Sequence, residues 1–550
     1  MIGLPPDSDS DVADLCIVGA GAAGLTLAAA FIGAGRRVVL LEAGGEKQTA
    51  TSQAIYEGEL TDPTIHPYLH HFRVRALGGA SRIWGGRCIP FDPIDFAERR
   101  WVPGPGWPIS LQSLLPYYAA AQVAAEAGPF DYDPRTALPG RPVEFAPGLD
   151  GPSIETRLER FSKPTNFWTR YRQALTMARD VWVSPETPVL AVRLTQDGSK
   201  VDHLEILDPG TGARRPLRAR AYVLAMGGLE TVRLMLASND VRPAGIGNDH
   251  DQLGRNYMSH LAATSGYLTF AGPPSQIAFD YERDAEGTYV RRRLAITADA
   301  QREFELLNIV FRTHLPDPVD PSHGDAILSA MYLVKDLVLY EYSRKFREHP
   351  VTLGDRLRHV GNIARQPWRL ASFGRTWVTD RILAERKLPS VVLGAANNRY
   401  ALEFHAEQAP NPDSRLTLSG DRDAYGMPRL RADWRITPID LESLKAAYAL
   451  LDRELRRTGA GALEYDAGAV VEAAVAAGAY GGHHLGGARM ARRPEDGVVD
   501  ESLKVYGTDN LFVASGAVLP TSSQANPTLT ILALTFRLAD HLKAVLDASA

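Results

Sequence analysis

ADLCIVGAGAAG, residues 13–24, is the stretch that decides the fold of this chain. Its apolar run at residues 15–18 is typical of a parallel strand that is buried on both faces. The small apolar residues 25–34 then predict a helix, and the apolar run at residues 38–41 predicts a second strand. Strand, helix and strand in this order form a β-α-β unit, so we expect an α/β domain with a parallel sheet.

Three glycines and one acidic residue indicate what this unit binds. Gly19, Gly21 and Gly24 form G-x-G-x-x-G at the turn from strand to helix, and Glu42 ends the second strand. The glycines permit a tight turn and a close approach of the backbone to a pyrophosphate, which the helix N-terminus binds through its N–H groups. A carboxylate at the position of Glu42 accepts hydrogen bonds from ribose hydroxyls. The unit therefore predicts a bound dinucleotide, without separating FAD from NAD.

Composition excludes several classes of protein. The 550 residues include 60 Lys and Arg against 65 Asp and Glu, so the chain lacks the basic excess of a nucleic-acid-binding protein. A hydrophobic content of 45% is typical of a globular protein rather than a disordered one. Cys16 lies in an apolar run and Cys88 in a glycine-rich loop, so we expect buried thiols and no disulfide. The acidic first residues and the lack of a long apolar stretch predict no signal peptide, no spanning helix and a cytoplasmic protein.

Two further motifs indicate a family. The loop RALGGASRIWGG, residues 75–86, contains four glycines, a serine and a tryptophan. Near the C-terminus, residues 482–490 read GHHLGGARM and residues 498–527 read VVDESLKVYGTDNLFVASGAVLPTSSQANP. These motifs resemble those of the glucose–methanol–choline (GMC) oxidoreductases, a family of FAD enzymes with G-G-x-S and H-x-x-G-[TG]-x-R-M motifs. The resemblance covers about residues 13–110, 180–262 and 400–550.

The resemblance implies a catalytic pair. It places the family's catalytic histidine on His483 and its partner on Asn526. A hydride can leave an alcohol carbon toward flavin N5 only as the hydroxyl proton is lost. An imidazole can accept that proton near neutral pH, and an amide can orient the oxygen without competing for the proton. We therefore expect His483 to act as the base.

The resemblance also implies a set of FAD-binding residues and the mode of attachment. Some sugar-oxidising relatives bind FAD covalently through a histidine just before the loop tryptophan, and here that position is Ile83. We therefore expect non-covalent FAD and no metal. The expected FAD contacts are Gly19, Gly21, Gly24, Glu42, Ala43, Arg75, Gly78, Gly79, Ser81, Trp84, Gly85, Gly86, Val192, Ala225, Gly227, Ser515, Gly516, Pro527 and Thr528.

The expected fold class is α/β, or α+β with two domains. A Rossmann-like FAD-binding domain would carry an inserted substrate domain of antiparallel strands and helices. Residues 415–418 and 430–434 predict a hairpin. The expected ranges are 11–262 for the first, discontinuous part of the FAD-binding domain, with a flavin-covering loop at 70–110; 263–480 for the substrate domain, with a helical insertion at 325–390; and 481–550 for the return to the FAD-binding domain.

We expect an FAD-dependent enzyme that oxidises a secondary ring hydroxyl of a sugar or glycoside to a ketone, by resemblance to the pyranose-oxidase-like bacterial branch of the family. The same chemistry on a sterol, terpenoid or polyketide alcohol stays open, as do a non-redox lyase with structural FAD and an inactive flavin-bearing subunit. The electron acceptor stays open among oxygen, a quinone and a carrier protein, an oligomer is possible, and association with a membrane is not expected. Residues 320–395 lie outside the family resemblance, and they fit a solvated helical insertion, a substrate lid or an oligomer contact.

Overall fold

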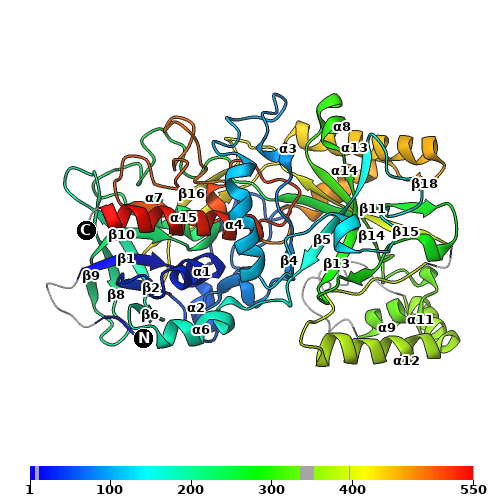
Figure 1. The fold of residues 1–550 in the computed structure, drawn as a ribbon, viewed down its shortest axis with the longest axis horizontal. Helices are drawn as coiled ribbons and strands as arrows, with labels where there is room; N and C mark the ends of the chain where they lie inside the picture. The colour runs from blue at the N-terminus through cyan, green and yellow to red at the C-terminus, as the bar shows by residue number, and fades with distance from the viewer. Residues whose placement is uncertain (6–11, 335–351, 396, 549–550) are drawn as a thin grey trace.

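The computed structural model describes all residues except 6–11, 335–351, 396 and 549–550. A parallel sheet of five strands lies at one end of the molecule, in the order β19-β10-β1-β2-β6 (Figure 1). Its strands come from distant parts of the chain. Each is an apolar run that is buried on both faces, as is typical of a parallel sheet. They are β1 (Ala13–Val18), β2 (Val38–Leu41), β6 (Val181–Ser184), β10 (Ala219–Leu224) and β19 (Leu511–Val513).

Helices cover this sheet. The glycine-rich turn leads into α1 (Ala22–Ala30), which packs against the long C-terminal helix α15 (Thr528–Ala548) (Figure 1). Helix α1 begins three residues earlier and ends four residues earlier than residues 25–34 predict. The early end has a physical reason, because Gly33 and Gly35 adopt positive φ and break the helix. The other helices here are α4 (Leu111–Ala124), α6 (Phe167–Met177) and α7 (Gly227–Ala237).

A larger, eight-stranded antiparallel sheet forms the other half of the molecule. Its order is β18-β11-β15-β14-β13-β5-β4, and β12 pairs with β13. Helices α13 (Pro438–Thr458) and α14 (Ala467–Ala477) pack on it, and Tyr448 of α13 contacts the rings of Phe311 and Phe404. The strands are β4 (Arg87–Cys88), β5 (Ile154–Phe161), β11 (His260–Phe270), β12 (Tyr281–Arg283), β13 (Tyr289–Ile296), β14 (Ile309–His314), β15 (Arg399–Glu407) and β18 (Gly461–Glu464).

Segments of the parallel-sheet half and of the antiparallel-sheet half alternate along the chain more often than the sequence predicts. Strands β4 and β5 lie within 11–262 but pair in the antiparallel sheet, and β11 crosses the expected boundary at 262/263. The expected α/β fold with an inserted antiparallel sheet is confirmed, whereas the domain boundaries stay a prediction. Cys16 and Cys88 are buried and free, as expected.

Two small sheets complete the strands. The predicted hairpin is confirmed, because β16 (Arg415–Arg422) pairs with β17 (Pro428–Asp433). Strand β17 also pairs with β3 (Glu59–Leu60). The second sheet holds β7 (Val189–Leu194), β8 (Val201–Leu207) and β9 (Arg214–Leu217). The short α-helices are α2 (Ala50–Ala54), α3 (Pro93–Phe96), α5 (Pro134–Ala137) and α8 (Ala298–Glu303).

The insertion is helical in its described parts. We call α9 (Ala326–Leu333), α11 (Leu353–Arg365), α12 (Pro367–Thr376) and η5 (Trp377–Leu383) the helical unit, which lies beside the antiparallel sheet at the lower right of Figure 1. Its α11 is attached through polar residues, since His359 and Asn362 are buried and bond Ser329 and nearby carbonyls. The helical prediction for 335–351 falls outside the described residues.

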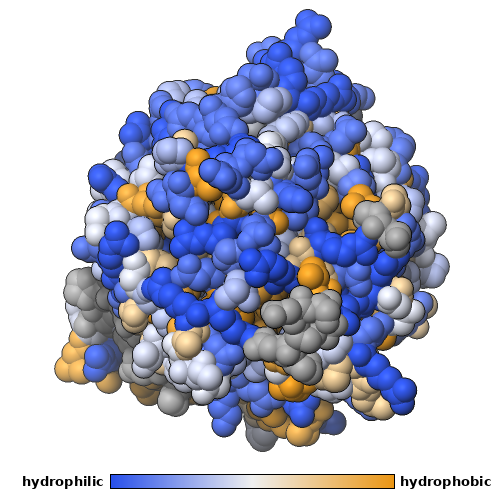
Figure 2. Space-filling model, turned by 90° about the vertical axis from the view of Figure 1, so that its left-hand side faces the viewer, coloured by the Kyte–Doolittle hydropathy of each residue, from blue (hydrophilic) through white to orange (hydrophobic). Residues whose placement is uncertain are grey.

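No helix in the described ranges is long and apolar enough to cross a membrane. The face at the parallel-sheet end is mostly hydrophilic, with apolar residues in small separate groups (Figure 2). Apolar residues scattered in this way are ordinary for a protein surface.

Candidate functional site

A cavity of about 1520 Å³ runs from the glycine-rich turn of β1 and α1 to His483 and Asn526. It is lined by both sheets and by the helical unit. The structure brings most of the predicted site residues to this one cavity, although they come from distant parts of the sequence. Those that line it are Gly19, Gly21, Glu42, Ala43, Arg75, Gly79, Ser81, Trp84, Gly85, Gly86, Ala225, Gly227, His483, Ser515, Gly516, Asn526, Pro527 and Thr528.

The glycine-rich turn fits a pyrophosphate. Gly19 has φ +103°, and a Cβ there would lie 2.7 Å from the Ala225 carbonyl oxygen. The N-cap of α1 is Gly21, whose lack of a side-chain cap leaves the helix N-terminus facing the cavity. A helix end without a capping side chain can offer its N–H groups to an anion. The turn therefore has the form that FAD or another dinucleotide requires.

Glu42 closes the same turn. Its two carboxylate oxygens accept hydrogen bonds from the backbone N–H groups of Ala20 and Gly44, each at 2.8 Å. Burial raises the pKa of Glu42, while these two hydrogen bonds oppose that effect. A carboxylate oxygen has more than one lone pair, so Glu42 can still accept a ribose hydroxyl.

In the loop 75–86, polar side chains hold the loop itself. Ser81 Oγ donates to the Gly78 carbonyl at 2.6 Å, and the Trp84 indole N–H donates to the Thr165 carbonyl at 2.8 Å. Gly78 has φ +98°, and a Cβ there would meet the side chain of Asn166 at 2.7 Å. Backbone N–H groups, rather than these side chains, are therefore the groups this loop can offer to a flavin.

Three predicted contact residues do not line the cavity. Gly24 lies behind the turn, where a Cβ would come within 1.9 Å of the Gly19 carbonyl oxygen. Gly78 provides the positive φ of the loop 75–86 described above. Val192 is fully buried in β7, and its N–H donates to Ser238 Oγ. The structure therefore gives Gly24 and Gly78 a role in backbone shape and gives Val192 a place in the core.

His483 and Asn526 meet at the other end of the cavity. The Asn526 amide Nδ2 lies 3.3 Å from His483 Nε2, and His260 Nδ1 lies 2.7 Å from His483 Nδ1. Burial, together with the nearby His260 and Arg87, lowers the pKa of His483 well below its usual value. His483 is therefore neutral, and able to accept a proton, at neutral pH.

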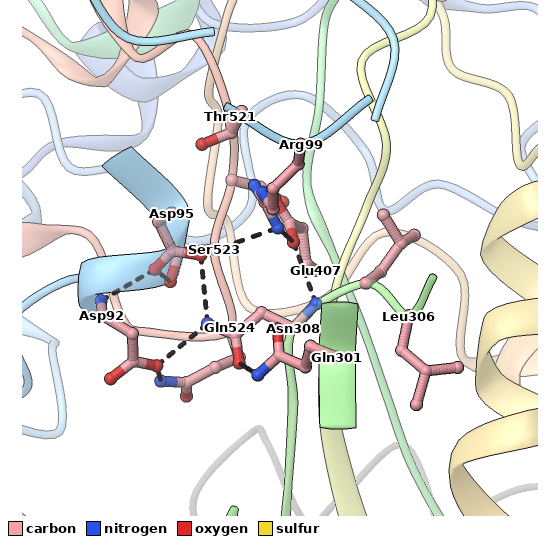
Figure 3. Close-up of polar contacts among 12 residues, drawn as sticks. Asp92, Asp95, Arg99, Gln301, Leu306, Asn308, Glu407, Thr521, Ser523 and Gln524 are labelled. Carbon is pink, nitrogen blue, oxygen red and sulfur yellow. Dashed lines mark hydrogen bonds and ion pairs between the residues drawn. The ribbon is translucent and has the colours of Figure 1, made fainter. Parts of the chain in front are cut away.

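A buried polar network holds the segment 521–526 that carries Asn526. Ser523 Oγ donates to Asp95 at 2.6 Å, and Gln524 Nε2 donates to Asp92 at 2.8 Å (Figure 3). Arg293 donates to the Gln524 side-chain oxygen at 2.6 Å. These bonds fix the segment on its far side, so the position of Asn526 is set by residues that do not reach the cavity.

Three histidines could hold a metal ion. One ring nitrogen each from His260, His405 and His483 lies within 4.8 Å of the others. His405 Nδ1 donates to the Gln524 carbonyl at 2.5 Å, and its Nε2 has no hydrogen-bond partner. The close approach of His260 to His483 is, however, the distance of a hydrogen bond, which a metal between them would have to break.

The cavity changes character beyond His483. Arg87, Arg291 and Glu403 line it from the antiparallel sheet. Burial alone would raise the pKa of Glu403, but Arg312, His314 and Arg87 lower it to about 2, so this carboxylate is charged. The helical unit adds an apolar wall that contains Leu370, Phe373 and Trp377.

Comparison with known families agrees with this geometry. Residues 410–535 match the family described as GMC oxidoreductase, and residues 14–84 match an FAD-binding domain. The chain therefore carries a GMC oxidoreductase C-terminal domain and an FAD-binding domain.

Relatives of the chain span nearly its whole length. It is 25% identical to 6'''-hydroxyparomomycin C oxidase of Streptomyces lividus, over 98% of this chain and 94% of the relative. It is 23% identical to 2-methyl-1,2-propanediol dehydrogenase of Mycolicibacterium austroafricanum, over 97% and 96%. The crystal structure of pyridoxine 4-oxidase from Mesorbium loti aligns with a TM-score of 0.55 at 19% identity, over 96% of this chain and 99% of that one, and shows the shared fold.

The sequence motifs did not point to His260 and His405. Both lie on strands of the antiparallel sheet, far in sequence from the motif that contains His483. The one available signal is that each histidine stands in a largely apolar stretch whose neighbours are buried. That signal identifies a buried polar residue but does not name its partner.

Proposed function

We propose that this FAD-dependent GMC oxidoreductase oxidises a secondary ring hydroxyl of a sugar or glycoside to a ketone. The observation that carries the proposal is the pairing of His483 Nε2 with the Asn526 amide on the wall of the cavity that begins at the glycine-rich turn. FAD, when bound, supplies the acceptor for the hydride. Residues of the protein orient the alcohol and accept its proton.

In this proposal, His483 and Asn526 divide the work on the alcohol. The hydroxyl proton goes to His483 Nε2, while the C–H bond gives up a hydride and the C–O bond becomes a carbonyl. Asn526 Nδ2 donates a hydrogen bond to the alcohol oxygen and so orients the carbon. A neutral, buried imidazole is suited to this step, because it can take the proton without first losing one.

The lining of the cavity supports a hydroxyl-rich substrate. The charged groups of Arg87, Arg291 and Glu403 can bind ring hydroxyls, and the named substrates of full-length relatives include hydroxyparomomycin C. Arginines outnumber acidic groups in this part of the lining, so a neutral sugar or glycoside fits better than a polycationic aminosugar. The wall of Leu370, Phe373 and Trp377 can accept an apolar aglycone.

Non-covalent attachment of FAD is part of the proposal. Ile83 lines the cavity at the position where some relatives carry the linking histidine, and an aliphatic side chain cannot form such a bond. Acid precipitation of the holoenzyme should release all of the yellow colour into the supernatant. Colour that stays with the pellet would contradict non-covalent binding.

The reaction is tested by anaerobic reduction of the bound flavin. The panel contains monosaccharides, neutral aryl glycosides, aminosugars and apolar alcohols, and the readout is loss of visible flavin absorption together with the ketone product. Bleaching by a neutral sugar or glycoside supports the proposal. Bleaching by the apolar alcohols alone would contradict the substrate class, and a dithionite-reducible flavin that no alcohol bleaches would contradict the redox reaction itself.

A further inference from the structure

We propose that His260 is a positioning residue that fixes the tautomer of His483, so that the lone pair of His483 lies on Nε2 and faces Asn526 and the cavity. The catalytic meaning of this inference rests on the proposed function, but the tautomer itself does not. The sequence motif around His483 does not indicate this role, because His260 lies far away in the sequence, on β11 of the antiparallel sheet.

The protons can be placed from one end of a hydrogen-bond chain. His260 Nε2 lies 3.1 Å from the Ser522 carbonyl oxygen, which can only accept, so the proton of the neutral His260 ring is on Nε2. Its Nδ1 therefore carries a lone pair. That Nδ1 lies 2.7 Å from His483 Nδ1, so His483 must donate from Nδ1 and carry its own lone pair on Nε2.

The other end of the chain is compatible with this answer. The Asn526 amide Nδ2 lies 3.3 Å from His483 Nε2, where a donor meets the lone pair of that tautomer. The carbonyl behind His260 thus requires one tautomer, and the amide in front of His483 matches it. The segment 521–526 supplies both, because Ser522 and Asn526 belong to it.

Fixing the tautomer matters for proton transfer. A neutral imidazole in the opposite tautomer would present an N–H to the alcohol and could not accept its proton. With His260 in place, His483 takes the proton on Nε2 and keeps its Nδ1–H bonded to a neutral acceptor. No other proton has to move during the step.

The groups around the two rings agree with neutral histidines. Burial lowers the pKa of His260 to about 4, despite a favourable interaction with Glu407. The His405 ring lies against His260 at a tilt of 34°, with 4.5 Å between ring centroids, and its own pKa is lowered well below the usual value by burial and by His260. Arg87 is the charged group that acts on both His483 and His405. Burial outweighs the opposing effect of Glu407, so both rings are neutral at neutral pH.

A second chain of hydrogen bonds, through His66, Tyr257 and His484, provides a matched control. His66 Nδ1 donates to the Pro67 carbonyl at 2.6 Å, Tyr257 OH donates to His66 Nε2 at 2.9 Å, and His484 Nδ1 donates to Tyr257 OH at 2.7 Å. This chain ends at His484, the neighbour of His483, and makes no hydrogen bond to His483. Tyr257→Phe therefore cuts a buried histidine chain nearby while leaving the contact between His260 and His483 in place.

The direct test is nitrogen NMR of the holoenzyme with ¹⁵N-labelled histidine, with His483 assigned by its loss in His483→Gln. We expect His483 to be protonated on Nδ1 and unprotonated on Nε2, and to lose this fixed state in His260→Phe but not in Tyr257→Phe. A proton on Nε2 of His483 in the unaltered protein would overturn the inference. Stoichiometric zinc or another metal that is lost in His405→Gln would also overturn it, because a metal among the three rings displaces the shared proton.

Kinetics provide a second readout. His260→Phe should slow anaerobic flavin reduction by about 10- to 100-fold at saturating substrate, the usual effect of removing an orienting partner. His260→Gln should recover part of the rate, because its amide oxygen can accept from His483 Nδ1. Equal rates for His260→Phe and Tyr257→Phe, with FAD content unchanged, would contradict a positioning role. If no alcohol reduces the flavin, the proposed function fails while the NMR result still decides the tautomer.

Discussion

At the scale of single residues, burial determines what His483 can do. An exposed histidine is partly protonated near neutral pH and would be a poor base in that form. Here burial, together with the nearby His260 and Arg87, disfavours the charged ring, so the proposed base can accept a proton. Asn526 adds a donor beside Nε2 without adding a group that titrates.

This environment predicts an unusual dependence of flavin reduction on pH. Protonation of His483 removes the base, and its lowered pKa moves that loss to more acidic pH. The rate of anaerobic reduction should therefore stay constant across neutral pH and fall only well below about 6.5, the usual pKa of histidine. Stopped-flow reduction across a pH series measures this. An acid limb centred at or above that value would contradict the account.

Removing the amide of Asn526 should cost less than removing the base. Asn526→Ala deletes one hydrogen bond to the alcohol oxygen, so we expect about tenfold slower flavin reduction, the effect of a net hydrogen bond of about 1.4 kcal/mol. The absorption spectrum of bound FAD should not change. A rate equal to that of the unaltered protein would show that Asn526 does not orient the substrate.

At the scale of elements, buried ion pairs join the loop after α3 to the antiparallel sheet. Arg99 donates two hydrogen bonds to Glu407 of β15, at 2.6 and 2.7 Å (Figure 3). Glu407 also accepts from the Asn308 backbone N–H, and Asn308 Nδ2 donates to Asp92 and Asp95. Asp92 and Asp95 in turn hold Gln524 and Ser523, so the network reaches the segment that carries Asn526.

Breaking this network should destabilise the fold. Arg99→Met leaves Glu407 buried without its cation, which typically costs about 3–5 kcal/mol. Arg135→Met is the control, because Arg135 is largely exposed and solvent screens its ion pair with Asp133, so the pair adds little stability. Urea unfolding measures both variants. Equal losses of unfolding free energy in the two variants would contradict a large contribution of the buried pair of Arg99 and Glu407.

The elements show what sequence can and cannot predict. The hairpin of β16 and β17 follows from two short stretches of strand composition and the turn-rich connection between them, which are local signals. The network of Arg99, Glu407 and Asp92 could not be predicted, since its members are far apart in sequence and no spacing connects them. The same holds for His260, whose role depends on the approach of β11 to the loop that carries His483.

At the scale of the whole molecule, residues of both interleaved halves line the cavity. The parallel sheet supplies the glycine-rich turn, the antiparallel sheet supplies Arg87 and Glu403, and the helical unit supplies an apolar wall. The sequence alone left the insertion without a role. Its contribution to the cavity wall supports the substrate-lid interpretation over a purely solvated insertion.

The helical unit should therefore select among substrates. Trp377 lines the cavity, whereas Trp368 of the same unit is exposed and does not. Trp377→Ala should weaken binding of glycosides with apolar aglycones by about tenfold or more, given about 25 cal/mol per Å² of lost apolar contact, and should leave free sugars little changed. Trp368→Ala should change neither. The dependence of the reduction rate on substrate concentration measures both variants, and equal effects on the two substrate types would contradict this role.

One measurement tests the central claim most directly: single-turnover flavin reduction by a substrate found in the panel, deuterated at the carbinol carbon, in the unaltered protein and in His483→Gln. The account predicts a deuterium isotope effect on reduction in both. It also predicts that reduction is slower by about 10²- to 10⁴-fold in the variant, the usual contribution of a positioned base, with FAD content unchanged. A variant that reduces its flavin at the rate of the unaltered protein would contradict the assignment of His483 as the base.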